Sequence, residues 1–269
     1  MESKGSKRAL AKKLGVSRSS LYYQSKLKIR DQCLKEQILA ALSEHPSYGH
    51  KRLAMHLHRN KKCILRIMKK FGIKPYRRRC RRPKKPGDLK KSPLDMVNWA
   101  KTLCPLRRNV LWASDFTYFW FHGRFWYLAT VIDVFNREIV GFSFSGRHNS
   151  ELVLGALQDA LSKHTAATYL HSDQGSEYQS YAYFDLLKFH KIQASFSAKA
   201  SPWQNGFQES FYSEFKKDLG DTSRFETIAE FMEALYLQIH YYNNRRIHTA
   251  LKMPPALFRQ HITSAYKLS

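Results

Sequence analysis

The chain has 269 residues, of which 43% are hydrophobic, enough for one or two folded domains and too many for a wholly disordered protein. No apolar run approaches the roughly 18 residues that a membrane-spanning helix needs, and the polar, basic N-terminus lacks the apolar segment of a secretion signal. We therefore expect a cytoplasmic protein with no membrane partner.

The net charge of +25 is concentrated in the first third of the chain. Residues 1–92 contain 28 Lys and Arg against 5 Asp and Glu, whereas residues 93–269 contain 18 against 16. This asymmetry predicts a basic region that binds a polyanion, joined to a nearly neutral globular region. Ribosomal or membrane-surface binding is the alternative that charge alone leaves open. The four cysteines lack the paired spacing of a structural zinc site.

The basic segment 1–30 has the pattern of a partial helix-turn-helix. A short helix through Leu10 and Leu14 is predicted to end at Gly15, and Ser17 is suited to N-cap a second helix. The segment is too short to fold alone, so a frayed basic tail is the alternative.

Residues 31–73 predict an all-helical helix-turn-helix DNA-binding domain. Apolar residues recur at helical spacing in 31–44, a turn follows, a second helix runs to about His58, and a third spans 61–71. The apolar face of the third helix consists of Ile64, Leu65, Met68 and Phe71. Its basic face consists of Lys62, Arg66, Lys69 and Lys70. A basic last helix suits a DNA major groove, and a solvated helix without a DNA role is the alternative.

Residues 74–104 combine many basic residues with proline, which predicts an extended linker rather than a helix. Such a segment can lie along phosphates or enter a minor groove. The arginines that we expect to bind DNA here are Arg77, Arg78, Arg79, Arg81 and Arg82.

From Val110 onward the pattern is that of a mixed α/β domain, which we expect to span residues 105–222. The predicted elements, in order, are strands at 110–118, 124–134 and 138–144, a helix at 150–163, a strand at 168–172, a helix at 182–190, a strand at 192–197 and a helix at 202–219. This order, βββαβαβα, is similar to that of the ribonuclease H-like fold. Residues 223–269 are expected to form a helical segment that packs on this core.

Three acidic residues on separate predicted elements are candidates for metal binding. Asp115 lies in a strand that looks buried, where an unpaired carboxylate is costly and a metal ion is a natural partner. Asp173 follows a strand just before Gly175, and Glu209 shares a helix face with Lys216. Three such acids can hold two Mg²⁺ ions, the usual apparatus for displacement at a phosphodiester. Lys216 is expected to contact a phosphate, with a solvated lysine as the alternative.

Several neighbouring residues are assigned lesser roles. Asp133 is expected to order the second strand, Glu177 to support the acidic site, and His171 either to orient a ligand or to be a chance neighbour. A turn near the C-terminus is expected either to touch DNA or to serve only in docking this segment, and it contains Arg245, Arg246 and His248.

Five stretches carry motifs that are specific in combination, namely residues 112–118, 131–137, 171–178, 209–211 and 242–248. Together they resemble the OrfB transposases of the insertion-sequence-three family, whose core is similar to that of retroviral integrase. The resemblance implies a DDE recombinase with an integrase-type ribonuclease H-like core. It also implies that Asp115, Asp173 and Glu209 are both catalytic residues and metal ligands.

In that family, a strand is hydrolysed at the element end and the freed 3′-OH then attacks DNA. The resemblance implies two Mg²⁺ ions, for which Mn²⁺ can substitute. The implied partners are double-stranded DNA (the terminal inverted repeats and the target), further copies of the chain in a synaptic complex, and an OrfA product or OrfA–OrfB fusion. A bacterial, nucleoid-associated protein is implied. The alternatives are a ribonuclease H-like nuclease that only hydrolyses and a domesticated DNA-binding protein without catalysis.

Overall fold

The structure is a computed structural model that describes residues 7–22, 26–77, 98–197 and 206–267. The chain divides into two compact units, residues 1–75 and 76–269. Among the described helices, none is both long enough and apolar enough to cross a lipid bilayer.

The first described segment forms α1 (Lys7–Lys13) and the 3-10 helix η1 (Arg18–Leu21). Gly15, with a φ of 64°, makes the turn after α1, and Ser17 caps η1 by accepting a hydrogen bond from the backbone N–H of Ser20. The predicted turn and cap are thus confirmed. The predicted second helix is present as a 3-10 helix of four residues.

Three helices follow in the same unit: α2 (Lys26–Glu44), α3 (His50–His56) and α4 (Lys61–Lys70). Asn60 caps α4, since its Oδ1 accepts a hydrogen bond of 2.8 Å from the backbone N–H of Lys62. The buried residues of α4 are Ile64, Ile67 and Met68. Leu65, predicted to be buried, is only half-buried, and Ile67 takes the inward position instead.

The second unit is built on a five-stranded sheet of order β3-β2-β1-β4-β5. The strands are β1 (Leu111–Phe121), β2 (Arg124–Asp133), β3 (Ile139–Ser145), β4 (Tyr169–Ser172) and β5 (Gln193–Phe196). The first three are paired antiparallel, whereas β4 pairs in parallel with both β1 and β5. The predicted succession of strands and helices is confirmed, although β1 extends three residues beyond its predicted end.

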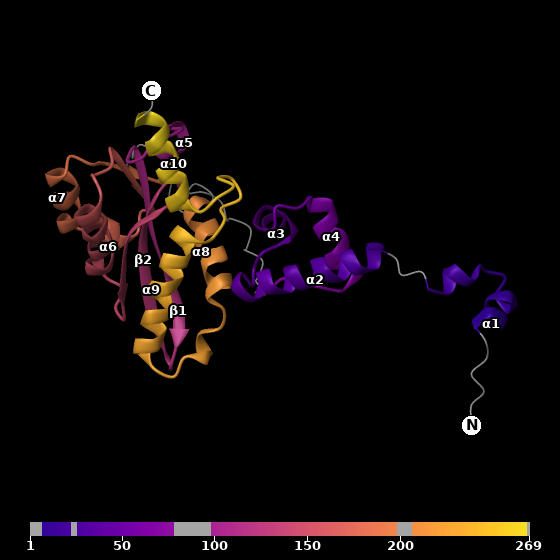
Figure 1. Cartoon of the computed structure of the whole chain (residues 1–269). Coiled ribbons are helices and arrows are strands. Elements are labelled where there is room, and N and C mark those ends of the chain that lie inside the picture. Colours follow the sequence, from indigo (N-terminus) through magenta and orange to yellow (C-terminus); the bar gives the residue numbers. More distant parts are fainter. Residues whose placement is uncertain (1–6, 23–25, 78–97, 198–205, 268–269) are drawn as a thin grey trace, which may run out of the picture. The chain divides into compact units, whose positions relative to one another are not determined.

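Helices cover both faces of this sheet (Figure 1). On one face lie α6 (Ser150–Lys163) and α7 (Tyr181–Phe189), and on the other lie α8 (Gly206–Leu219) and α9 (Ile228–Asn244). The remaining described helices are α5 (Trp99–Thr102), η2 (Ser176–Gln179), η4 (Thr222–Arg224) and α10 (Pro255–Lys267).

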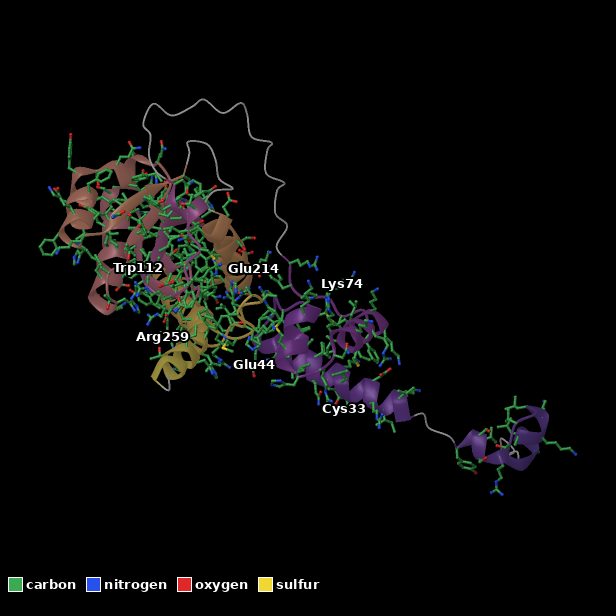
Figure 2. The ribbon with its side chains drawn as sticks, turned by 90° about the horizontal axis from the view of Figure 1, so that it is seen from above. Cys33, Glu44, Lys74, Trp112, Glu214 and Arg259 are labelled. Atoms are coloured by element: carbon green, nitrogen blue, oxygen red, sulfur yellow. The ribbon has the colours of Figure 1, made fainter. Side chains whose placement is uncertain are left out.

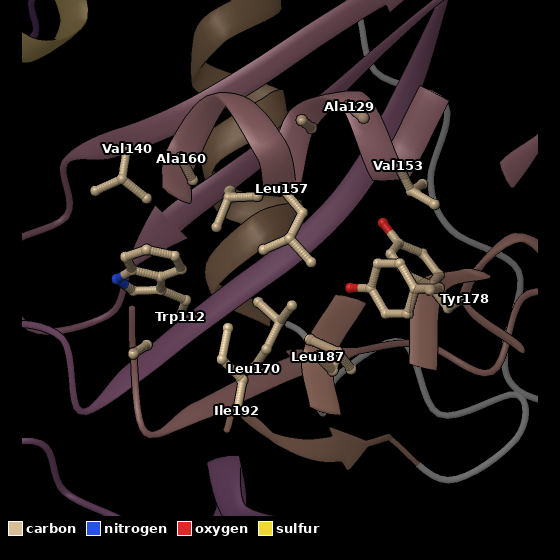
Figure 3. Close-up of a cluster of buried hydrophobic side chains, with 14 of the residues drawn as sticks. Trp112, Ala129, Val140, Val153, Leu157, Ala160, Leu170, Tyr178, Leu187 and Ile192 are labelled. Atoms are coloured by element: carbon tan, nitrogen blue, oxygen red, sulfur yellow. The ribbon is translucent and has the colours of Figure 1, made fainter. Parts of the chain in front are cut away.

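Side chains of β2 alternate between the two helical layers, as the two-residue period of a strand requires. Ala129 and Val131 pack with α6, whereas Leu128 and Ile132 pack with α8 and α9. Figure 3 shows the first of these clusters, in which Trp112 is fully buried, and Figure 2 shows the same residue among the crowded side chains of the unit. Each large apolar side chain buried in this way contributes roughly 1.5–3 kcal/mol.

Candidate active site

Asp115 and Asp173 occupy matching positions on adjacent parallel strands. Ala113 of β1 pairs with His171 of β4, and each aspartate follows two residues later in the sequence. Asp115 is still within β1, whereas Asp173 comes directly after Ser172, the last residue of β4. Because adjacent strands lie about 4.8 Å apart, the two acids begin from neighbouring backbone positions.

Asp115 is a half-buried acid whose ionisation is disfavoured. Burial, together with the negative charges of Asp173 and Glu209, raises the pKa of the Asp115 carboxyl to about 7. The hydrogen bond of 2.8 Å from the backbone N–H of Phe116 to Oδ1 opposes this shift. The acids on β1, after β4 and on α8 therefore interact electrostatically.

Asp173 is fixed by the loop that follows β4. Its Oδ1 accepts a hydrogen bond of 3.0 Å from the backbone N–H of Gly175. Burial and the charge of Glu177 raise the pKa of Asp173, while the Gly175 hydrogen bond and the charge of His148 lower it. A Cβ on Gly175 would stand 2.6 Å from Glu177 Oε2 and 3.1 Å from Asp173 Oδ1, so a side chain here would displace the Glu177 carboxylate and crowd that of Asp173.

Glu177 lies near Asp173, its predicted support of the acidic site stays a prediction, and its own partner was missed. The Nε2 atom of His148 lies 3.2 Å from Glu177 Oε1, and the His148 ring contacts the ring of Phe116 at 4.5 Å between centroids. His148 comes from the segment between β3 and α6, 29 residues before Glu177, and the sequence between them offers no periodic signal that links the two.

Glu209 is exposed in the first turn of α8, between two residues that attach this helix to β1. The side-chain amide of Gln208 donates a hydrogen bond of 2.5 Å to the carbonyl of Ala113. The hydroxyl of Tyr212 donates one of 2.6 Å to the carbonyl of Asp115 itself. Both residues were missed, although their spacing of four places them on one helix face.

Among the described residues, no three side chains of His, Cys, Asp or Glu lie close enough together to hold a metal ion. The three acids have hard oxygen atoms, which are the ligands that Mg²⁺ prefers. The pKa of Asp115 is raised mainly by burial and in smaller part by the negative charges of Asp173 and Glu209, and a cation would offset both effects. In charge and in donor chemistry, therefore, these side chains fit a divalent cation.

Lys216 lies against β1 rather than free in solvent. Its Nζ donates a hydrogen bond of 2.8 Å to the carbonyl of Tyr118 and lies 5.1 Å and 5.0 Å from the ring centroids of Tyr118 and Phe119. Its predicted phosphate contact stays a prediction.

In the N-terminal unit, two of the four basic residues of α4 with a predicted DNA contact are paired within the protein. Arg66 and Lys70 reach the carboxylate of Asp31 on α2, at 2.5 Å and 2.7 Å. Their hydrogen bonds hold the pKa of Asp31 well below its usual range. Lys62 and Lys69 are exposed, as is Arg77 in the linker. The other linker arginines with a predicted DNA contact lie outside the described residues: Arg78, Arg79, Arg81 and Arg82.

Two further residues have structural roles. Arg246 is only 2% exposed and pairs with Glu214 at 2.7 Å and with Asp218, so it docks the C-terminal segment on α8, the second of its predicted roles. His171 is buried, and its Nδ1 lies 2.8 Å from the hydroxyl of Ser195 on β5. His171 thus links β4 to β5, and its predicted role in orienting a ligand stays a prediction.

Comparison with known proteins gives the family. A family model described as integrase core domain matches residues 105–202, and a second of the same description matches residues 190–255. The transposase for insertion sequence element IS904 of Lactococcus lactis subsp. lactis (strain IL1403) is 33% identical over 237 residues, which cover 84% of this chain and 93% of the relative. The chain belongs to the transposases of the insertion-sequence-three family.

A more local match points the same way. Transposase InsF for insertion sequence IS3A of Escherichia coli (strain K12) is 38% identical over 110 residues, 40% of this chain and 38% of that relative. A chain of the simian T-cell lymphotropic virus intasome in complex with PP2A regulatory subunit B56 gamma has a TM-score of 0.51 and 15% identity, covering 82% of this chain and 73% of that chain. The transposase thus has a ribonuclease H-like core preceded by a helical region, as predicted.

Proposed function

We propose that Asp115, Asp173 and Glu209 are the catalytic carboxylates of this transposase and bind its divalent cations, two Mg²⁺ ions for which Mn²⁺ can substitute. The observation that supports this is the raised pKa of Asp115, to which the charges of the other two acids contribute. When bound, the cations would stabilise charge on the phosphoryl oxygens and activate the attacking oxygen.

The protein's own part in this proposal is to present the acids in a fixed arrangement. Asp115 is set by the central strand, and Asp173 by the backbone of Gly175. Glu209, on the exposed first turn of α8, completes the ligand set. In the reaction, a water oxygen attacks phosphorus at the element end and the 3′ oxygen leaves. The resulting 3′-OH attacks phosphorus in the target strand, whose own 3′ oxygen leaves.

The proposed partner of residues 1–92 is the double-stranded DNA of the element's terminal repeats, because these residues carry nearly all of the excess positive charge. Joining two element ends to one target requires more than one copy of the chain, so we propose a homo-oligomer that acts on bacterial DNA in the cytoplasm. An OrfA product, or a fusion with it, is a further proposed partner, on the basis of the family resemblance.

A strand-transfer assay with labelled element termini and Mg²⁺ or Mn²⁺ tests the proposed site. Asp115→Asn and Glu209→Gln should each reduce cleavage and joining by more than about 100-fold. Asp185→Asn on α7 and Glu233→Gln on α9 are matched controls, since both acids are exposed and lie outside the site. Cleavage without joining by the native chain would identify a nuclease that only hydrolyses. Unchanged biological activity of Asp115→Asn would identify a non-catalytic DNA-binding protein.

A further inference from the structure

A groove lies along the outer half of β1, between this strand, the second half of α8 and η4. Three aromatic residues of the β1–β2 hairpin line it with large exposed areas: Tyr118 is 58% exposed, Trp120 57% and Phe125 44%. The alternate residues of the same strand, Phe119 and Phe121, are buried in the core beneath α8 and α9.

Hairpin stability does not account for the exposed rings. The ring of Phe125 contacts that of Trp120 at 4.8 Å and that of Tyr118 at 5.3 Å, in edge-to-face geometry. Such cross-strand pairs stabilise a hairpin, but these rings still leave about half of their surface in water. Polar residues are usual at the water-facing positions of a strand, so three adjacent aromatic rings indicate a binding surface.

The groove is closed to an added β-strand. In the described structure, β4 pairs only with Leu111–Ala113, so the outer half of β1 has no strand partner on this side. Two carbonyls of this half, however, already accept hydrogen bonds from side chains. The carbonyl of Tyr118 accepts from Lys216, and that of Trp120 accepts from the hydroxyl of Thr222 at 3.0 Å. A strand of another protein would pair with β1 through hydrogen bonds to these carbonyls. Because the carbonyls are already bonded, strand addition at this edge is blocked.

The groove instead offers flat rings, hydroxyl groups and one ammonium group. Aromatic rings bind unpaired nucleobases by stacking, and a lysine has three donors that can also reach a phosphate. Asp115 precedes Tyr118 by three residues on the same strand, roughly 10 Å along it, although the two side chains leave opposite faces of the strand. Tyr212, whose hydroxyl binds the carbonyl of Asp115, also lines the groove.

We propose that this groove binds unpaired DNA bases next to the scissile phosphate. Tyr118 and Trp120 stack on the bases, Phe125 supports their rings, and Lys216 contacts the adjoining phosphate. The inference rests on the proposed role of the acidic site, because the position of the scissile phosphate is defined by that site.

The test measures how the full-length chain binds a single-stranded oligonucleotide of about 12 thymidines with one 2-aminopurine, whose fluorescence falls on stacking. Raised salt is used because it weakens the binding of the basic region more than it weakens stacking. Trp120→Ala and Tyr118→Ala should each weaken binding roughly tenfold and abolish the fluorescence change. Trp120→Phe should retain both. The controls are Tyr181→Ala and Phe189→Ala on α7, whose side chains are 92% and 80% exposed.

Three results would overturn the proposal or separate it from the active-site proposal. Unchanged affinity and fluorescence in both alanine variants would overturn stacking. Loss of self-association on light scattering, with unchanged DNA binding, would overturn it in favour of a second copy of the chain in the groove. Asp115→Asn should lose strand transfer but keep the fluorescence change. If that variant still joins DNA while Trp120→Ala loses stacking, the active-site proposal fails and the stacking site stands.

Discussion

The hydroxyl of Tyr212 on α8 binds the backbone carbonyl of Asp115 on β1 at 2.6 Å, so the helix that carries one candidate acid is attached at the backbone of another. Gln208, one turn earlier, binds the carbonyl of Ala113. Thr130 on β2 contacts both side chains, at 2.9 Å from the Tyr212 hydroxyl and 3.4 Å from the Gln208 carbonyl oxygen. This buried network fixes the position of α8 relative to β1.

Removing either hydrogen bond should disturb the position of Glu209, with only a small loss of protein stability. Tyr212→Phe and Gln208→Leu each leave a buried carbonyl with one partner fewer, at a cost of about 1–2 kcal/mol. If α8 then shifts, the Mg²⁺ concentration for half-maximal strand transfer should rise by about 10–100-fold. Thermal melting and a Mg²⁺ titration of activity measure the two effects. Tyr236→Phe, an exposed tyrosine on α9, is the control. A lower melting temperature with an unchanged Mg²⁺ dependence would limit the network to stability.

Asp115→Asn should stabilise the metal-free protein at high pH. The pKa of Asp115 is about 7 in the folded protein and 3.8 ordinarily, so the folded state keeps a proton that the unfolded chain loses between these values. The free energy of unfolding therefore falls as pH rises from about 4 to 7. Above pH 7 the buried charge costs about 1–2 kcal/mol, with allowance for solvent screening.

The neutral amide of Asn carries no such cost, so thermal melting in the presence of a chelator should show a gain of a few degrees at pH 8 and little change at pH 4. Asp185→Asn, on the exposed surface of α7, should change neither value. Equal melting temperatures of native chain and Asp115→Asn at pH 8 would contradict the raised pKa.

Arg246 should be essential for the fold. Arg246→Met removes the cation that is paired with Asp218, whose side chain is only 3% exposed. It also removes one of the two cations paired with Glu214, which keeps Lys217. Breaking a buried pair in this way typically costs 3–5 kcal/mol, whereas replacing both partners by apolar residues costs much less. Urea unfolding should show a large loss for Arg246→Met and a partial recovery when Asp218→Leu is added. Arg245→Met, at an exposed neighbouring position, is the matched control. Equal losses of stability in Arg246→Met and Arg245→Met would contradict a buried ion-pair role for Arg246.

The sequence predicts the strands, helices and acidic residues that depend on local residue patterns. Alternating residues define β1 and β2, and helical spacing defines α6 and α8, because each pattern matches the face that is buried. The motifs around Asp115, Asp173 and Glu209 identify the acids. The hydrogen bonds of Gln208 and Tyr212 could not be predicted, because they join residues 95 and 97 positions apart, and no periodic pattern relates such positions.

The same limit applies to α4, where the sequence shows a uniform basic face. Asp31 precedes Arg66 by 35 residues, so only the tertiary structure shows that Arg66 and Lys70 are paired while Lys62 is exposed.

Because the pKa of Asp31 is lowered in the folded state, the stabilisation from this cluster is complete above pH 4 and is lost as pH falls below it. Asp31→Asn should therefore lower amide-exchange protection of α2 and α4 at pH 7, with a smaller effect near pH 2. Equal protection in both proteins at pH 7 would contradict this.

Substitutions on α4 should separate DNA binding from stability. Lys62→Ala and Lys69→Ala remove exposed charges, so each should weaken duplex binding for every sequence and reduce the slope of log K against log salt by about 1. Neither should change amide-exchange protection. Arg66→Ala should instead reduce protection of α2 and α4, because it removes a partner of Asp31. Fluorescence anisotropy over a range of salt concentrations measures the slopes on labelled duplex DNA. The opposite result would be an unchanged slope for Lys62→Ala and a lower slope, without loss of protection, for Arg66→Ala. Arg66 would then bind DNA, and the face of α4 turned toward Asp31 would enter the DNA major groove.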